Sequence, residues 1–282
     1  MIQAEIRDGH VHIEVDCRRR PAIYLDQFAL HHFASREAPN TRFLEAFKTR
    51  GELLFSAGNT LEIATTDGLN ALQVVGFLHR IGPHWVPIES DPFKVTIEMA
   101  GRSHGPHPIL DGDLLNFVYE LSPGPPDTLT LGGAMLAFHG YPEEKAFYRE
   151  TMRKAKQRVA DKVAEMRAAY RADPAAAADR YTVIQDRGKV MHIASAVMRA
   201  IAIDEAKSYA WSLNDATDLL HAMVPIAVAD AVFLDKAWKN RLARLDLPMR
   251  LPRIYYGPQA DEFLDWLESV PIPYEDNRGG EA

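Results

Sequence analysis

Short apolar runs alternate along the chain with longer segments in which apolar residues recur at three- and four-residue steps. Such runs are typical of strands buried on both faces of a parallel sheet, and they lie at 22–25, 52–57, 231–234 and 253–256, with a further extended piece at 85–88. Helical patterns lie between them, at 27–50, 188–211, 212–228 and 261–270. Strands that alternate with helices predict right-handed crossovers and therefore an α/β fold with a parallel sheet.

Two segments depart from this alternation. Residues 4–15 alternate apolar and polar side chains around Asp8-Gly9, which predicts a small hairpin with that pair at its turn. A long helix is expected from Pro142, a residue suited to a first helical turn, to about Asp173, with a length of roughly 45 Å. Its apolar stripe consists of Tyr148, Met152, Ala155, Val159, Val163, Met166 and Tyr170.

The stretch at 101–142 holds seven glycines and six prolines among 42 residues. It predicts a loop-rich insertion with one helix around 113–121. The chain is therefore expected to divide into five parts. These are an N-terminal hairpin extension at 1–20, the first part of the α/β domain at 21–100, a Gly/Pro-rich and helical insertion at 101–187, the second part of the domain at 188–272, and a flexible tail at 273–282.

Composition narrows the class of protein. The 282 residues are 47% hydrophobic and 25% charged, which excludes a disordered or low-complexity chain. No uncharged run is long enough to span a bilayer, and the first ten residues lack the pattern of a signal peptide, so a cytoplasmic protein without membrane contact is expected. A single cysteine, Cys17, excludes an internal disulfide framework and a cysteine-based zinc cluster. Dinucleotide-binding and P-loop glycine motifs are absent.

Four acids stand where strands end or helices begin. Asp26 ends the first strand, and Glu62 falls in the first turn of the helix after the second strand, which Asn59 or Thr60 would cap. Asp218 falls in the first turns of a late helix, and Asp235 ends the strand that follows. In a parallel sheet these positions share one edge, so the carboxylates are expected to meet there. Like charges at close range repel unless a cation neutralises them, and oxygen ligands without thiols favour Mg²⁺ or Mn²⁺.

Each acid also has a purely structural interpretation. Asp26 could serve only as a helix N-cap, and Glu62 only as a favourable charge near a helix N-terminus. Asp215, one turn before Asp218, fits the acid of a helix-capping box or an additional metal ligand. Asp230 begins its strand, which would place it at the opposite edge of the sheet.

Three segments together resemble the PIN domain family of metal-dependent ribonucleases. They are IYLDQ, FSAGNTLEIA, and DLLHAMVPIAVADAVFLDKAW with its spacing of seventeen residues from Asp218 to Asp235. The resemblance covers roughly residues 20–90 and 190–256. It implies a three-layer α/β/α fold with a central, mostly parallel sheet, to which the hairpin and the long helical insertion are added. It also implies that Asp26, Glu62, Asp218 and Asp235 are catalytic acids that bind Mg²⁺ or Mn²⁺ and hydrolyse RNA phosphodiester bonds.

The long helix carries a surplus of positive charge. Residues 142–172 contain nine Lys or Arg against five acids, which leaves a net charge of −11 on the rest of the chain. A basic helix on an acidic body would attract an RNA backbone, single-stranded or structured. It could equally be a solvated face with ion pairs one turn apart. The candidate contacts to nucleic acid are Arg153, Lys156, Arg158, Arg19 and Arg20.

Two other functions stay open at this point. The chain could be a PIN-like module without catalytic activity that binds nucleic acid or acts as a scaffold, or a metal-dependent phosphoesterase acting on a small molecule. A dehalogenase-type phosphatase is excluded because LDQFA lacks the second acid of a D-x-D pair. The sequence also leaves open a homodimer and a protein partner such as an antitoxin.

Overall fold

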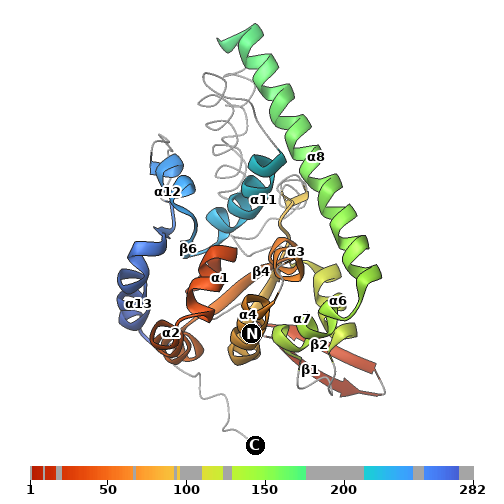
Figure 1. The fold of residues 1–282 in the computed structure, drawn as a ribbon, viewed down its shortest axis with the longest axis vertical. Coiled ribbons are helices and arrows are strands. Elements are labelled where there is room, and N and C mark those ends of the chain that lie inside the picture. Colours follow the sequence, from red (N-terminus) through yellow and green to blue (C-terminus); the bar gives the residue numbers. More distant parts are fainter. Residues whose placement is uncertain are drawn as a thin grey trace, which may run out of the picture.

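The computed structural model describes residues 2–8, 10–16, 21–65, 68–91, 94–95, 110–122, 129–175, 213–243 and 251–272. Within these residues the chain forms an α/β fold around a five-stranded parallel sheet (Figure 1). In spatial order the strands are β5 (Trp85–Ile88), β4 (Glu52–Ser56), β3 (Ala22–Leu25), β6 (Ala231–Phe233) and β7 (Arg253–Tyr255). All five predicted strands are confirmed. Pro87 lies within β5, which is tolerated because β5 is an edge strand.

The order of the strands defines a special position in the sheet. The chain first builds outward from β3 through β4 to β5, and later returns to place β6 and β7 on the other side of β3. The direction of winding therefore reverses between β3 and β6. In open parallel sheets, ligands bind in the crevice outside the carboxyl ends of the strands at such a reversal.

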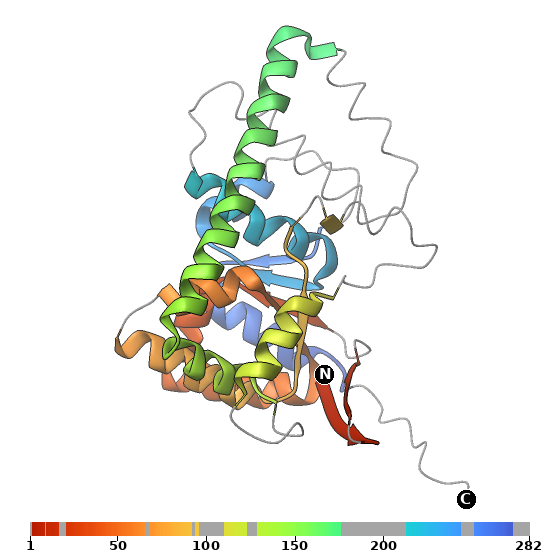
Figure 2. The same ribbon diagram turned by 90° about the vertical axis from the view of Figure 1, so that its right-hand side faces the viewer.

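Helices cover both faces of the sheet (Figures 1 and 2). One layer consists of α1 (Gln27–Ala34), α2 (Glu37–Arg50), α4 (Leu69–Ile81), α6 (Gly112–Leu121), α7 (Leu131–His139) and α13 (Ala260–Ser269). The other layer consists of α8 (Pro142–Ala172), α11 (Leu213–Val228) and α12 (Lys236–Ala243). Successive strand side chains enter opposite layers, so Ile23 and Leu25 pack into the first core while Ala22 and Tyr24 pack into the second. Helix α3 (Ala57–Thr65) contributes to both, through Ile63 and Leu61.

The segment predicted as one helix at 27–50 is two helices, α1 and α2. The backbone N–H of Ser35 closes α1 on the carbonyl of His31, and Arg36 is extended, with φ −123° and ψ 114°. The break lets both helices pack on the same face of the sheet. Phe33 of α1 and Phe43 of α2 meet there with ring centroids 5.1 Å apart.

The glycine- and proline-rich stretch contributes two helices to the first layer. The expected helix around 113–121 is confirmed as α6, whereas α7 was not predicted, because two adjacent glycines lower the helix propensity of its first turn. Gly132 has a packing role instead. A Cβ at this position would lie 2.4 Å from the backbone nitrogen of His79, so only glycine lets α7 approach α4 this closely.

Two elements flank the sheet. Strands β1 (Ile2–Arg7) and β2 (His10–Val15) form the expected antiparallel hairpin, and Asp8 adopts a left-handed φ of 50° at the turn. Helix α8 begins at Pro142 as predicted and projects beyond the sheet (Figure 1). Four residues of its predicted stripe are buried, namely Met152, Val159, Val163 and Met166.

Parts of the sequence interpretation fall on residues outside the described ranges. These are the helix expected at 188–211, the tail at 273–282, and residues 101–109 and 123–128 of the glycine- and proline-rich stretch. Among the described helices, none combines the length and apolar character needed to cross a membrane.

Candidate active site

The two acids that follow β3 and β6 lie at the reversal of winding. Asp26 comes directly after β3, and its backbone N–H donates to the carbonyl of Phe233 at the end of β6 over 3.1 Å. Asp235 is also near enough to act on the Asp26 carboxylate, because its charge raises the pKa of Asp26 and its backbone lowers it. The structure thus brings the first and last acids of the predicted set together at the carboxyl edge of the sheet.

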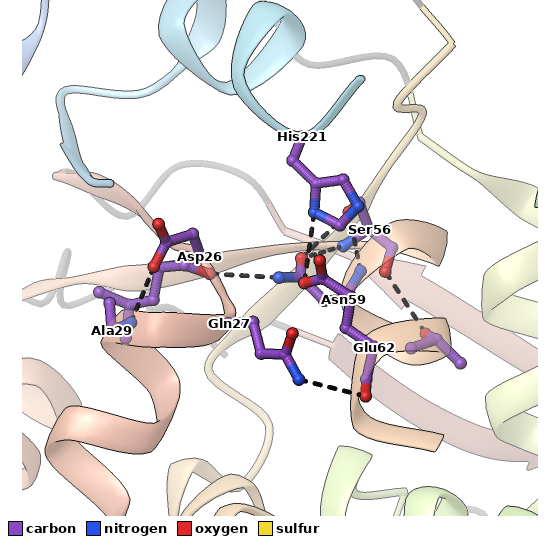
Figure 3. Close-up of polar contacts among 9 residues, drawn as sticks. Asp26, Gln27, Ala29, Ser56, Asn59, Glu62 and His221 are labelled. Carbon is purple, nitrogen blue, oxygen red and sulfur yellow. Dashed lines mark hydrogen bonds and ion pairs between the residues drawn. The ribbon is translucent and has the colours of Figure 1, made fainter. Parts of the chain in front are cut away.

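Both acids also cap helices. Asp26 Oδ1 accepts a hydrogen bond from the backbone N–H of Ala29 over 2.7 Å at the start of α1 (Figure 3). Asp235 Oδ1 accepts one from the backbone N–H of Trp238 over 2.8 Å at the start of α12. The interpretation of Asp26 as an N-cap is therefore confirmed. These bonds fix the orientation of each carboxylate at the edge of the sheet.

Glu62 reaches this edge from α3, which begins directly after β4. Neither Asn59 nor Thr60 is the N-cap, because the helix begins at Ala57. Ser56 takes that place, and Asn59 completes a reciprocal pair with it. The Ser56 hydroxyl accepts from the Asn59 backbone N–H over 3.4 Å, and Asn59 Oδ1 accepts from the Ser56 backbone N–H over 3.0 Å. The early start of the helix also corrects the position of Glu62, which lies in the second turn rather than the first.

Two amide side chains hold α3 against the end of β3 (Figure 3). Asn59, which is 1% exposed, donates from Nδ2 to the carbonyl of Leu25 over 3.2 Å. Gln27, the residue after Asp26, donates from Nε2 to the carbonyl of Glu62 over 3.3 Å. The backbone that carries Glu62 is therefore tied on both sides of Asp26.

The acids act on one another through space. Burial raises the pKa of Asp26 to about 7; the hydrogen bond from Ala29 opposes this shift, and the charges of Asp235 and Asp218 add to it. Asp218 is an exposed residue of α11. It therefore stands at the rim of the site, within electrostatic reach of Asp26.

The pKa of Glu62 rises further. Burial raises it to about 8, the charge of Asp26 adds to the shift, Lys156 lowers it, and Asp218 raises it again. The charge of Asp218 thus acts on both half-buried acids, and the charge of Asp26 acts on Glu62. The four acids predicted from the sequence share one electrostatic site, although they come from four separate parts of the chain.

His221 was not predicted as part of the site. It lies on α11 one turn after Asp218, its side chain is 8% exposed, and its Nδ1 is 3.5 Å from Glu62 Oε2. Burial and the charge of Lys156 lower the pKa of His221 to about 4, so the imidazole is neutral at pH 7. The ring lies over Gly58, where a Cβ would come within 2.7 Å of two ring atoms. The sequence signal that could have identified His221 is the D-x-x-H spacing in DLLHAMV, which puts Asp218 and His221 on one face of the helix.

The basic residues of α8 differ in what they contact. Arg153 is exposed and pairs with Glu150 over 2.8 Å one turn earlier, while Arg158 pairs with Asp91 over 3.1 Å. Lys156 is half-buried and its charge acts on both Glu62 and His221. Among the described residues of the predicted basic set, Lys156 is therefore the one whose charge acts on the carboxylate site.

The remaining predicted site residues lie elsewhere. Asp230 is at the opposite edge of the sheet, as its position predicted, and its Oδ2 accepts from the backbone N–H of Ala22 over 2.8 Å at the start of β3. Asp215 lies on α11, but its side chain lies outside the part of the chain that the structure describes. Arg19 and Arg20 lie outside the described residues altogether.

The donor set fits a hard divalent cation by its chemistry. Carboxylate oxygens are the ligands that Mg²⁺ and Mn²⁺ prefer. Burial raises the pKa of Asp26 and Glu62, neighbouring acids raise it further, and a cation would relieve the repulsion among these acids. In the part of the chain that the structure describes, no three His, Cys, Asp or Glu side chains are arranged so that they could already hold an ion. Binding would therefore require these side chains to adjust.

A separate cavity of about 850 Å³ lies beyond the end of β5, between α6 and α8. Its acidic lining residues include Glu89, Asp91, Asp111 and Asp113. Lys94 and Arg158 also line it, but each pairs with one of these acids, Lys94 with Glu89 and Arg158 with Asp91. This surplus of carboxylates disfavours a phosphorylated small molecule in the cavity.

Comparisons with protein-family models, with curated proteins and with solved structures find no match for this chain. Its function must therefore be argued from the geometry and charge of the carboxylate site.

Proposed function

We propose that the protein is a Mg²⁺- or Mn²⁺-dependent endoribonuclease with a PIN-like fold. One observation carries the proposal. Acids from the end of β3, from α3, from α11 and from the junction of β6 and α12 share one electrostatic site where the winding of the sheet reverses. The position is the usual one for a ligand in an open parallel sheet, and the donors are those of a hard divalent cation.

Asp26, Glu62, Asp218 and Asp235 would hold the ion, with Asp215 as an additional ligand. When bound, such an ion lowers the pKa of a water molecule and stabilises negative charge on a phosphoryl oxygen. These are the two requirements for hydrolysis of a phosphodiester bond.

The chain's own groups prepare this site. Asn59 and Gln27 tie α3 to the end of β3, so Asp26 and Glu62 keep their relative positions. The neutral His221 ring packs beside Glu62 and keeps water from that side of the carboxyl group. Lys156 supplies the positive charge that draws a phosphate towards an otherwise acidic site.

Cleavage of a labelled RNA tests the proposal. Single-stranded and hairpin RNAs should be cut in the presence of Mg²⁺ or Mn²⁺, and EDTA should stop the reaction. Asp26→Asn should reduce the rate at least about 100-fold, because the side chain keeps its shape and loses a negative oxygen ligand. Intact RNA after long incubation with either metal would refute the catalytic proposal.

A second candidate is a PIN-like module that binds RNA without cutting it. The observation in its favour is that Asp26 and Asp235 already serve as helix caps, while the described side chains form no ready three-residue metal set. RNA binding that is retained in EDTA, together with intact RNA in Mn²⁺, would favour this candidate.

A further inference from the structure

An exposed phenylalanine borders the carboxylate site. Phe28 lies in the first turn of α1, two residues after Asp26, and 52% of it is exposed. Phe33 on the same helix is fully buried in the core. The exposure of Phe28 is therefore not explained by packing of α1 on the sheet.

The ring of Phe28 is held in place by the segment that follows β7. A Cβ on Gly257 would lie 3.2 Å and 3.3 Å from Cε1 and Cζ of Phe28, so the ring leans against the Gly257 backbone. On its own helix, the ring centroid is 6.1 Å from that of His32. Because α1 begins, and β7 ends, at the carboxyl edge of the sheet, this contact lies on the same edge as Asp26 and Asp235.

The positive charge of Lys239 lies over the residue that precedes Gly257. Lys239 Nζ is 4.7 Å from the centroid of the Tyr256 ring, and Tyr256 directly precedes Gly257. Lys239 also donates to Gln259 Oε1, which fixes the ammonium group over this segment. Its helix, α12, is the one that Asp235 caps. An exposed aromatic ring and a lysine thus flank the segment at residues 256–257, beside two of the four acids.

We propose that Phe28 is a stacking platform for an unpaired RNA base and that Lys239 contacts a neighbouring phosphate. This inference rests on the proposed function and specifies its substrate as single-stranded RNA. Aromatic side chains stack on bases of single strands regardless of sequence, and a cation beside the ring tracks the backbone. In a duplex the bases stack on each other and do not offer a free face to such a ring.

Binding measured in EDTA tests the platform apart from catalysis. The probe is a fluorescein-labelled ten-nucleotide single-stranded RNA, compared with a duplex of the same sequence. Phe28→Ala should weaken binding of the single strand about tenfold and leave duplex binding unchanged. Phe28→Trp should retain the wild-type affinity, since it keeps an aromatic face. Phe147→Ala is the matched control, because Phe147 is also exposed, at 69%, but lies on α8.

A second variant tests the same ring without removing it. Gly257→Ala places a methyl group against Phe28 and should make the ring shift by a few tenths of an ångström, so single-strand affinity should fall by less than in Phe28→Ala while thermal unfolding confirms a folded protein. The platform is overturned if wild type does not bind the single strand, if Phe28→Ala binds like wild type, if Phe28→Trp is as weak as Phe28→Ala, or if Phe147→Ala loses as much.

Cleavage of the same RNA in Mn²⁺ separates this inference from the proposed function. Cutting without dependence on Phe28 would overturn the platform alone. Binding that depends on Phe28 without any cutting would support the platform and overturn the catalytic proposal alone.

Discussion

The backbone N–H of Asp26 donates a hydrogen bond to the carbonyl of Phe233 over 3.1 Å, at the end of the strand that leads to Asp235. Asp26 and Asp235 therefore follow neighbouring strands, β3 and β6, although more than two hundred positions separate them in the chain. Because both groups of this bond belong to the backbone, replacing the Asp235 side chain leaves it in place. The charge of Asp235 can therefore be removed without releasing Asp26.

Asp235→Asn should lower the rate of RNA cleavage at least about 100-fold while the protein stays folded, because asparagine still caps α12 but lacks the negative oxygen. Asp230→Asn is the matched control at the other end of β6. Its side chain can still accept from the Ala22 backbone N–H, and it lies at the opposite edge of the sheet. Single-turnover rates of the two variants should therefore differ. Equal losses would show that the effect is structural.

The raised pKa values of Asp26 and Glu62 make stability depend on pH. Both groups ionise near pH 4 in an unfolded chain, but only near 7 and 8 in the folded protein. The folded state therefore binds more protons in this window, and its stability falls as pH rises through it. Asp26→Asn removes one of these groups and keeps the cap on α1.

Urea unfolding in EDTA should show Asp26→Asn more stable than wild type by about 4 kcal/mol at about pH 8, because a shift of about three pKa units is worth about 1.4 kcal/mol per unit, and by only about 1 kcal/mol at about pH 4.5. His221, whose pKa is lowered to about 4, acts with the opposite sign as pH falls below about 6.5, but it is present in both proteins and its contribution cancels. A difference in stability that is the same at both pH values would contradict the raised pKa of Asp26.

Lys156 should matter more for RNA binding than Arg153, although both lie on the basic helix. Lys156 acts on the carboxylate site, whereas Arg153 is paired with Glu150 in solvent. Lys156→Ala should weaken single-strand binding in EDTA and flatten the log–log salt dependence by about 0.7 for the lost contact. Anisotropy titrations at several salt concentrations measure both effects. The same slope change in Arg153→Ala would mean that the whole helix acts as a diffuse basic surface.

Gly58→Ala tests the contact between α3 and the His221 ring. Helix propensity alone would favour alanine, but the new Cβ would lie 2.7 Å from two ring atoms. We expect a loss of about 1–3 kcal/mol in the free energy of unfolding. Gly76→Ala on α4, where a Cβ meets nothing within 4 Å, should instead be neutral or gain up to about 1 kcal/mol. In a double-mutant cycle, His221→Ala should relieve most of the Gly58→Ala loss, and additive losses would rule out the contact.

Four of the five strands, β3, β4, β5 and β6, were predictable because each is a short, mostly apolar run that is buried along its whole length. The edge strand β7 is only partly buried and was predictable from its short extended pattern at 253–256. The break between α1 and α2 was not, because Ser35 and Arg36 carry no strong breaking signal and the turn is set by packing of Phe33 on Phe43. Helix α7 was not predictable, because its paired glycines lower the helix propensity of its first turn. The close approach of Gly132 to α4, which requires a glycine, is visible only in the tertiary structure.

The candidate acids were also predictable, because the ends of parallel strands share an edge. The groups around them were not. Asn59 and His221 act through contacts with Leu25 and Glu62 that lie far away in the sequence. Lys156 could be named as basic from the sequence, but its approach to Glu62 depends on how α8 lies against α3 and α11.

Binding of Mn²⁺ to the free protein, titrated calorimetrically, tests most directly whether these acids form a metal site. Wild type should bind the ion, and Asp26→Asn should weaken its affinity at least about tenfold, since one charged ligand is lost. Asp230→Asn, at the opposite edge, should bind as wild type does. The absence of any binding by wild type at millimolar Mn²⁺, or equal affinities in wild type and Asp26→Asn, would contradict the account.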